Sequence, residues 1–341
     1  MARNSPIAVI ARDVARAVRI GSCRVVLVLA AVLAATGAQA QAFPSKPMRF
    51  VIPYAPGGLP DVMARLVAQK VAESVGQTVT VENRAGASGI IAVEFVARSE
   101  ADGHTLLVGD IAQYALNPAL RPNLSYDMLR DFTPVTQAVR GPLFLMANAS
   151  LGVKSVRELV ALAKAKPGLP YGSSGNASVH QLGVEQLALA AGVRFEHIPY
   201  KGVAQAVPSL LAGDTFFMFV SPTSAGIDAH VKTGKVVVLA VSGAQRWPQL
   251  PEVPTMAESG YPGVEAVANI GFFAPSATPA ASIAKLNAEL VRALRHPDVE
   301  SRIPALGAAV VAGSSEEFTA RVRSDQARYA KLVREVRVTV D

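Results

Sequence analysis

The chain has 341 residues, of which 50% are hydrophobic and 17% charged, and its formal net charge is +7. This length suffices for two domains of ordinary size with their own cores. The only cysteine is Cys23, so the rest of the chain excludes disulfides, thiol catalysis and thiolate metal sites.

Residues 1–42 are predicted to be a cleaved secretory signal peptide. Five arginines precede the apolar run VVLVLAAVLAATGAQAQA, which ends in overlapping Ala-x-Ala sites at residues 38–42. The alternative, a membrane anchor, needs about 20 consecutive apolar residues. Cys23 precedes the apolar run, which argues against a lipid-modified cysteine. This segment holds five of the 33 basic and one of the 26 acidic residues, so its removal leaves a net charge of +3. No basic run follows, and no nucleic-acid partner is expected.

Residues 48–110 are predicted to alternate between strands and helices. Strands are predicted over 48–54, 77–83 and 105–110, with helices over 61–75 and 90–96 between them. Gly76 is expected to end the first of these helices. This order indicates an α/β fold with a parallel or mixed sheet flanked by helices.

The same alternation restarts after about residue 143. The predicted helices are 156–166, opened by a capping box of Ser155 and Glu158, then 179–191 and 206–213. Two more are predicted, one opened by Thr278 as N-cap and Pro279 as first residue, and a last one capped by Ser314 and Glu317. Strands are predicted over 195–200 and 235–241. Two α/β units followed by a helical tail favour a two-domain protein.

Four Gly-rich turns stand where a predicted strand is followed by a predicted helix. They are PYAPGGLPD (53–61), NRAGASG (83–89), YGSSGNASVH (171–180) and YKGVAQAV (200–207). Ligands of open α/β sheets bind at the carboxyl ends of strands, and free N–H groups at helix N-termini attract anions. Asp61 is predicted to cap its own helix. A single such turn is usually structural, but four together favour a carboxylate-binding site.

The other chemically active residues form no recognised pattern. The five histidines lack metal-ligand spacing, and Ser174, Ser178 and His180 lack the G-x-S-x-G turn of a hydrolase. No G-x-G-x-x-G or P-loop motif is present. We therefore predict no catalytic residue, no metal and no cofactor, and a capping or ligand-contacting role for His180.

Several linked motifs carry a family resemblance. They are FPSKPMRFVIPYAPGGLPD, VENRAGASG, ADGHTLLVGD, GSSGNASVHQLGVE, HIPYKGVAQAVPSLLAGD and LPEVPTMAESGYPG. In their order and spacing, over about residues 43–338, the chain resembles the Bug family. These proteins are extracytoplasmic solute receptors of tripartite tricarboxylate transporters.

The resemblance implies a type II-like periplasmic binding protein fold with the ligand in an interdomain cleft. Domain 1 would comprise residues 43–143 plus 265–341, and domain 2 residues 144–264. The implied protein is a periplasmic, monomeric, non-enzymatic receptor that captures a small carboxylate and presents it to membrane permease subunits. By motif match, the expected ligand-binding residues are Tyr54, Gly57, Gly58, Asp61, Ser88, Gly89, Asp110, Ser174, Ser178, His180 and Lys201. A ligand sensor for a signalling partner and a secreted enzyme remain alternatives.

Three departures from the family pattern are candidates for ligand specificity. Phe216 and Val220, in AGDTFFMFV, stand where members commonly have aspartates, and Asn269, in ANIGFFAP, stands where many have tryptophan. The lost aspartates predict a carboxylate ligand with an apolar or aromatic body rather than an amino acid.

Overall fold

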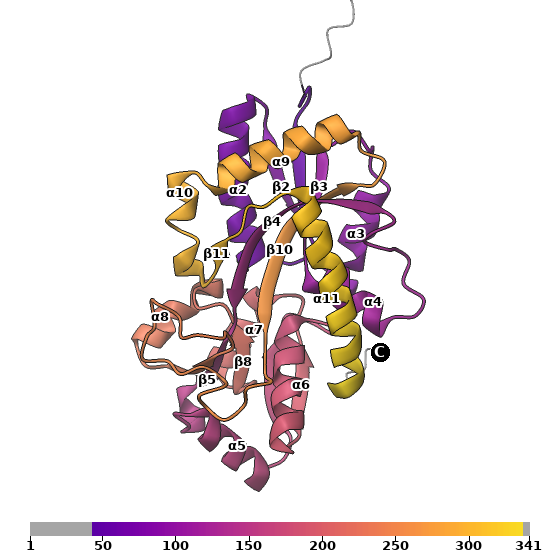
Figure 1. The fold of residues 1–341 in the computed structure, drawn as a ribbon. Helices are drawn as coiled ribbons and strands as arrows, with labels where there is room; N and C mark the ends of the chain where they lie inside the picture. Colours follow the sequence, from indigo (N-terminus) through magenta and orange to yellow (C-terminus); the bar gives the residue numbers. More distant parts are fainter. Residues whose placement is uncertain (1–42, 337–341) are drawn as a thin grey trace, which may run out of the picture. The chain divides into compact units, whose positions relative to one another are not determined.

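The computed structural model describes residues 43–336, so the predicted signal peptide lies outside the described residues. Every helix and strand described below belongs to the unit that begins at Lys46 (Figure 1). Among the described residues, no helix has the length and apolar character needed to cross a membrane.

The first sheet has six strands in the order β11–β4–β10–β3–β1–β2. The strands are β1 (Met48–Ile52), β2 (Val79–Asn83), β3 (Thr105–Asp110), β4 (Phe132–Pro142), β10 (Val267–Pro275) and β11 (Ala309–Val310). β1 runs parallel to β2 and β3, whereas β10 is antiparallel to β3 and β4, so the sheet is mixed. The predicted strand at 105–110 is confirmed, and the others agree to within a few residues.

The second sheet has five strands in the order β7–β6–β8–β5–β9. The strands are β5 (Phe144–Asn148), β6 (Leu169–Ser173), β7 (Phe195–Pro199), β8 (Phe217–Val220) and β9 (Val236–Val241). β6 is parallel to β7 and β8, and β5 is antiparallel to β8 and β9. Sequence reasoning did not single out β5 or β8.

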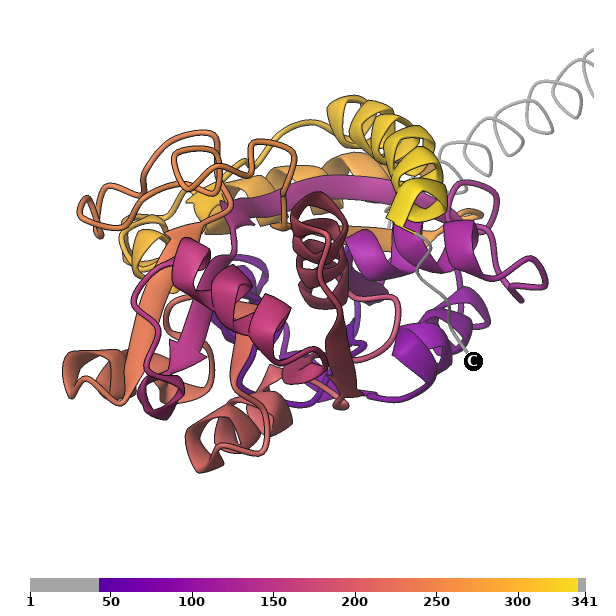
Figure 2. The same ribbon diagram turned by 90° about the horizontal axis from the view of Figure 1, so that it is seen from below.

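Helices pack on each sheet. The first lobe, as we call the first sheet with its helices, includes α2 (Leu59–Val75), η1 (Ala87–Gly89), α3 (Ile90–Ala97), η2 (Ala112–Leu116), α4 (Asn117–Leu120), α9 (Ala280–Leu294), α10 (Pro297–Glu300), η5 (Pro304–Leu306) and α11 (Ser315–Val336). The second lobe, the second sheet with its helices, includes η3 (Ala149–Leu151), α5 (Val156–Ala165), α6 (Val179–Ala191), α7 (Val203–Ala212), η4 (Ser224–Gly226) and α8 (Ile227–Lys232). Figures 1 and 2 show α6 of the second lobe beside α11 of the first.

The chain passes between the lobes at two adjacent places. One is the step from β4 to β5 at Leu143, and the other is the segment from Ser242 to Ala266 that leads into β10. The Leu143 N–H donates to the Ala266 carbonyl at 2.8 Å, and the Ser242 N–H donates to the Leu143 carbonyl at 2.9 Å. These bonds hold the two crossings together, which is the geometry of a hinge. The exact domain limits stay a prediction.

The central strands β5 and β8 of the second sheet are buried on both faces, as β8 illustrates. In β8, Phe217 and Phe219 join one hydrophobic cluster, whereas Met218 and Val220 join another on the opposite face. Side chains alternate between the faces of a strand, so a strand covered on both sides becomes apolar throughout.

The helix starts show which capping predictions were right. Ser155 accepts from the Glu158 N–H at 3.2 Å, and Ser314 and Glu317 bond each other's backbone N–H, so both capping pairs are confirmed. The prediction for Thr278 was wrong: α9 begins at Ala280 after an extended Pro279, and no side chain caps it.

The prediction that Asp61 caps its own helix was also wrong. α2 begins two residues earlier, at Leu59, with Gly58 as its N-cap. Asp61 is therefore the third helical residue, and its carboxylate reaches back to the Gly57 N–H at 3.0 Å. Pro60, whose fixed φ suits the first turn, explains the earlier start.

Candidate functional site

A cavity of about 40 Å³, the inner cavity, lies between the two lobes. Its first-lobe wall includes Tyr54, Gly58, Asp110, Ala268 and Ile270, and its second-lobe wall includes Ser174, His180, Val203, Ser221 and Ser224. Apart from the two in β10, these residues end β3, follow β1, β6 or β8, or lie at the starts of α2, α6 and α7. The cavity thus stands at the carboxyl ends of strands, where open α/β sheets bind ligands.

A wider pocket of about 500 Å³, the outer pocket, shares Tyr54 and Ser174 with the inner cavity. Its wall includes Ser88, Gly89 and Asn176, together with the cationic side chains of Arg121 and Lys201. Within the described residues, Arg121 and Lys201 form no ion pair. The outer pocket therefore presents positive charge at one side of the inner cavity, which attracts anions.

Two hydrogen bonds join the lobes beside these cavities. The Ser88 hydroxyl donates to the Asn176 carbonyl at 2.9 Å, and the Ala225 N–H donates to the Gly57 carbonyl at 3.2 Å. Ser88 (φ 54°) and Ala225 (φ 52°) each occupy a left-handed conformation that is uncommon for non-glycine residues. Each lies in a short 3₁₀ turn that leads into a helix, so the lobes meet through matching strained turns.

Tyr54 and Asp110 form a half-buried pair on the first-lobe wall. The Tyr54 hydroxyl donates to Asp110 Oδ1 at 3.0 Å, and the Ala112 N–H donates to the same oxygen at 2.8 Å. Removal from water disfavours the charged carboxylate and raises the pKa of Asp110 to about 6. Burial also raises the pKa of Tyr54, which stays a neutral hydroxyl.

Ser174 and His180 form the corresponding pair on the second-lobe wall. The Ser174 hydroxyl oxygen lies 2.7 Å from His180 Nδ1. Burial lowers the pKa of His180 to about 4, so the imidazole is neutral at pH 7. Ser178 caps α6 by accepting from the Gln181 N–H at 3.3 Å, which fixes the turn that carries His180.

The structure brings eight of the eleven predicted ligand-binding residues into these walls. Tyr54, Gly58, Asp110, Ser174 and His180 line the inner cavity, Ser88, Gly89 and Lys201 line the outer pocket, and Tyr54 and Ser174 line both. Gly57, Asp61 and Ser178 line neither. Asp61 instead accepts from Arg65 (2.9 Å) and Asn83 (3.0 Å), a network that shapes the Gly57 turn. A ligand contact by any of these residues stays a prediction.

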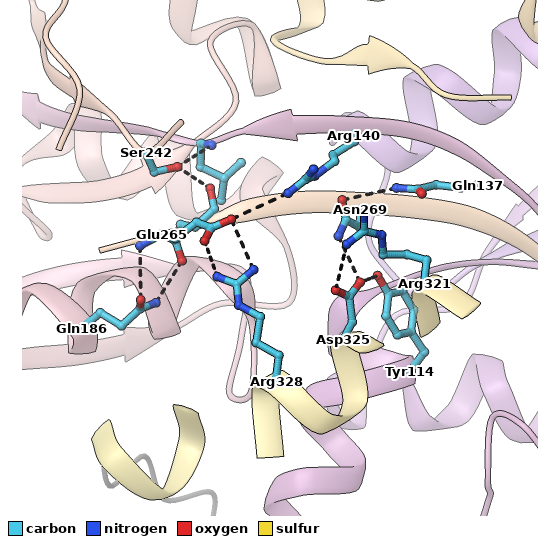
Figure 3. A network of polar contacts seen from close by, with 12 residues as sticks. Tyr114, Gln137, Arg140, Gln186, Ser242, Glu265, Asn269, Arg321, Asp325 and Arg328 are labelled. Carbon is cyan, nitrogen blue, oxygen red and sulfur yellow. Dashed lines mark hydrogen bonds and ion pairs between the residues drawn. The ribbon is translucent and has the colours of Figure 1, made fainter. Parts of the chain in front are cut away.

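The three specificity candidates lie outside both walls. Phe216 and Val220 pack in the hydrophobic clusters of the second sheet. Asn269 is buried behind the cavity, where it donates to Asp325 at 3.2 Å and accepts from Gln137 at 3.3 Å (Figure 3). Its neighbours Ala268 and Ile270 line the cavity instead. Because none of these three residues lines either cavity, their positions give no support to the prediction of a ligand with an apolar or aromatic body.

Sequence reasoning missed Ser221 and Ser224 in the cavity wall. They belong to SPTSAG, a fifth strand-to-helix turn that follows the apolar strand FMFV. The signal was available in the sequence, because this turn has the same Ser-and-Gly composition as the others. Among the described residues, no group of three or more His, Cys, Asp or Glu is placed to hold a metal ion.

Comparisons with known proteins agree with this architecture. BugT from Bordetella pertussis is 35% identical over 298 residues, which cover 87% of this chain and 91% of BugT. The solved structure of an adipate-bound protein of R. palustris has a TM-score of 0.83 at 32% identity and covers 87% of this chain and 99% of that one. Malate-bound MatC from Rhodopseudomonas palustris has a TM-score of 0.81 at 32% identity, with coverages of 85% and 100%.

These similarities confirm the predicted periplasmic binding protein fold and the role of a solute-binding receptor. A model described as "Tripartite tricarboxylate transporter family receptor" (TctC) matches residues 63–338, most of the chain. The chain belongs to this TctC family, which includes the Bug proteins.

Proposed function

We propose that this receptor captures a small organic carboxylate in the inner cavity and presents it to the permease subunits of a tripartite tricarboxylate transporter. The observation that carries the proposal is the position of the cavity at the starts of α2, α6 and α7, contributed by both lobes. Free backbone N–H groups at helix starts bind anions.

The lining supports recognition by hydrogen bonds. Ser174, Ser221 and Ser224 supply hydroxyls, and His180 supplies a neutral ring. Among the described residues, no lysine or arginine lines the inner cavity. Donors fixed on the backbone and on short side chains hold a carboxylate at low cost in conformational entropy.

Ligand capture is coupled to the closing of two domains, residues 43–143 plus 265–341 and residues 144–264. A ligand that contacts both walls stabilises the closed state relative to the open one. The Ser88–Asn176 and Gly57–Ala225 bonds add to the stability of the closed state. Ligand specificity is determined by the residues that line the inner cavity.

Isothermal titration with dicarboxylates, aromatic acids and amino acids tests the ligand class, after native mass spectrometry has identified any ligand retained on purification. Saturable binding of a carboxylate, together with a smaller radius of gyration in X-ray scattering, is expected. Binding without compaction would contradict the closure, and turnover of the bound acid would favour an enzyme.

Transport and location need separate tests. We propose export to the periplasm with removal of residues 1–42, and a monomeric receptor without cofactor. N-terminal sequencing of the exported protein checks the cleavage, and light scattering checks the monomer. Ligand uptake by cells that lack this protein, compared with complemented cells, checks the link to a permease; unchanged uptake would favour a sensor.

A further inference from the structure

Asp110 offers one acceptor that no protein group uses. Both hydrogen bonds to its carboxylate, from the Tyr54 hydroxyl and the Ala112 N–H, go to Oδ1. Within the described chain, Oδ2 has no hydrogen-bond partner. The residue is part of the inner cavity wall and is not fully buried. Oδ2 is therefore available to a molecule in the cavity.

Within the described residues no positively charged side chain pairs with Asp110; Arg121 and Lys201 line the outer pocket instead. The titratable groups around it are Tyr54 after β1, Tyr114 in η2, Tyr126 and, in the wall contributed by α6, His180. Burial keeps the three tyrosines protonated and the histidine neutral at pH 7. Above pH 6 the carboxylate is thus an uncompensated acceptor in a site that otherwise offers donors.

We propose that Asp110 determines ligand specificity by accepting, at Oδ2, a hydrogen bond from a hydroxyl or ammonium group of the bound carboxylate. This inference rests on the proposed function, because it assumes that a carboxylate occupies the inner cavity. The ligand class becomes a hydroxy acid or an amino acid. The donors around Ser174 and His180 hold its carboxylate, and Asp110 selects its second polar group.

The same arrangement disfavours a second ionised carboxylate beside Asp110. Two neighbouring carboxylates in a site of low dielectric repel each other, so the ionisation of both groups costs free energy. Such a group fits only where one of the two carboxyls holds a proton. The inference differs from the one drawn from Phe216, Val220 and Asn269, which lie outside the cavity wall.

Succinate, malate and aspartate form a matched panel, because they differ at one carbon by a hydrogen, a hydroxyl or an ammonium group. Titration calorimetry at pH 7.5 is expected to give about tenfold or greater preference for malate or aspartate over succinate. In Asp110→Asn the preference should fall to within about threefold. If the natural donor is an ammonium group, aspartate should lose more affinity than malate.

Asp214→Asn is the matched control, because it removes an exposed acidic side chain and should leave the preference unchanged. Lowering the pH to 5 should raise succinate affinity relative to malate in the wild type, since a protonated Asp110 donates to a carboxylate. Asp110→Asn measured at both pH values accounts for titration of the ligands themselves.

The outcomes separate the two proposals. An unchanged preference in Asp110→Asn would overturn the role of Asp110 while leaving carboxylate binding intact. Absence of binding by every acid in this panel and in the wider one would overturn the proposed function and this inference with it. If Asp110→Asn loses its cooperative thermal transition, the wild-type pH comparison decides: equal responses of succinate and malate would contradict the inference.

Discussion

The lobes meet on two sides, which are held by different kinds of contact: the cleft side, beside the two cavities, and the hinge side, beside the two chain crossings. On the cleft side, the contacts are a hydroxyl to a carbonyl, an N–H to a carbonyl, and the approach of Gly58 to Val203. On the hinge side, polar side chains gather around Glu265, and a second, separate group surrounds Asp325 (Figure 3).

The hinge-side network is centred on Glu265. The Gln186 side-chain amide donates to the Glu265 carbonyl at 2.9 Å and accepts from its N–H at 3.2 Å. The Glu265 carboxylate pairs with Arg328 of α11 and lies 3.7 Å from Arg140 of β4. The hinge side thus adds side-chain contacts to the main-chain bonds at Leu143, whereas the cleft side relies on backbone groups and small residues. We expect changes on the hinge side to alter stability and changes on the cleft side to alter ligand binding.

The largest effect is expected from filling the cleft side with Gly58→Val. A Cβ at this position would lie 3.2 Å from Val203 Cγ2, and the valine methyls would reach further. Overpacking should oppose closure and weaken ligand binding about 100-fold in calorimetry. Gly263→Val, where a Cβ meets nothing within 4 Å, is the control. Undiminished affinity in Gly58→Val would show that the lobes need not approach.

The next largest effect is expected on the hinge side, from Gln186→Ala. The change leaves the N–H and carbonyl of Glu265 without their partner and should lower the free energy of unfolding by about 2 kcal/mol. Urea unfolding measures this loss. Gln69→Ala removes an exposed side chain that bonds only Glu73, and it should change little. Equal losses in the two variants would contradict the structural role of Gln186.

A smaller effect concerns pH and the second sheet. Burial lowers the pKa of His197 to about 4, and its ring bonds Ser173 at 2.6 Å. The neutral ring is favoured in the folded state, so its stabilisation is present above pH 6.5 and is lost as the pH falls toward 4. His197→Gln should flatten this decline by about 1 kcal/mol in urea unfolding at pH 6.5 and 4.5. An identical decline of the unfolding free energy with pH in variant and wild type would refute this prediction. His230→Gln is the control.

The smallest effect is expected from Ser88→Ala on the cleft side. One interlobe hydrogen bond is lost, which should weaken ligand binding about fivefold and leave the unfolding free energy of the unliganded protein almost unchanged. Ser99→Ala removes a similar hydroxyl-to-carbonyl bond within one lobe and should not affect binding. A loss of stability without a loss of affinity in Ser88→Ala would place its bond among the contacts that maintain the fold.

Much of the fold was predictable because local patterns determine it. The alternation of strands and helices, the capping pair at Ser155 and the end of the first helix at Gly76 were all confirmed. The first residue of a helix was harder to predict. Pro60 lies inside the first turn of its helix, whereas Pro279 lies just before its helix, and the local sequence does not distinguish the two cases.

The candidate site was predictable in position but not in detail. The Gly-rich turns indicated which loops converge, and most of their predicted residues line the two cavities. The failure at Asn269 has a physical cause. β10 is buried along almost its whole length, so its sequence carries no alternation that distinguishes the cavity face from the face toward α11. The availability of Asp110 Oδ2 likewise depends on distant residues.

The bond from Ala225 to Gly57 joins two main-chain groups across the cleft. No side-chain substitution at either position removes the donor or the acceptor, apart from proline in place of Ala225. Side-chain substitutions in the lining of the inner cavity therefore leave the donor and the acceptor of this bond in place. Ligand preference in such receptors can therefore change one residue at a time, while this main-chain contact between the lobes is kept.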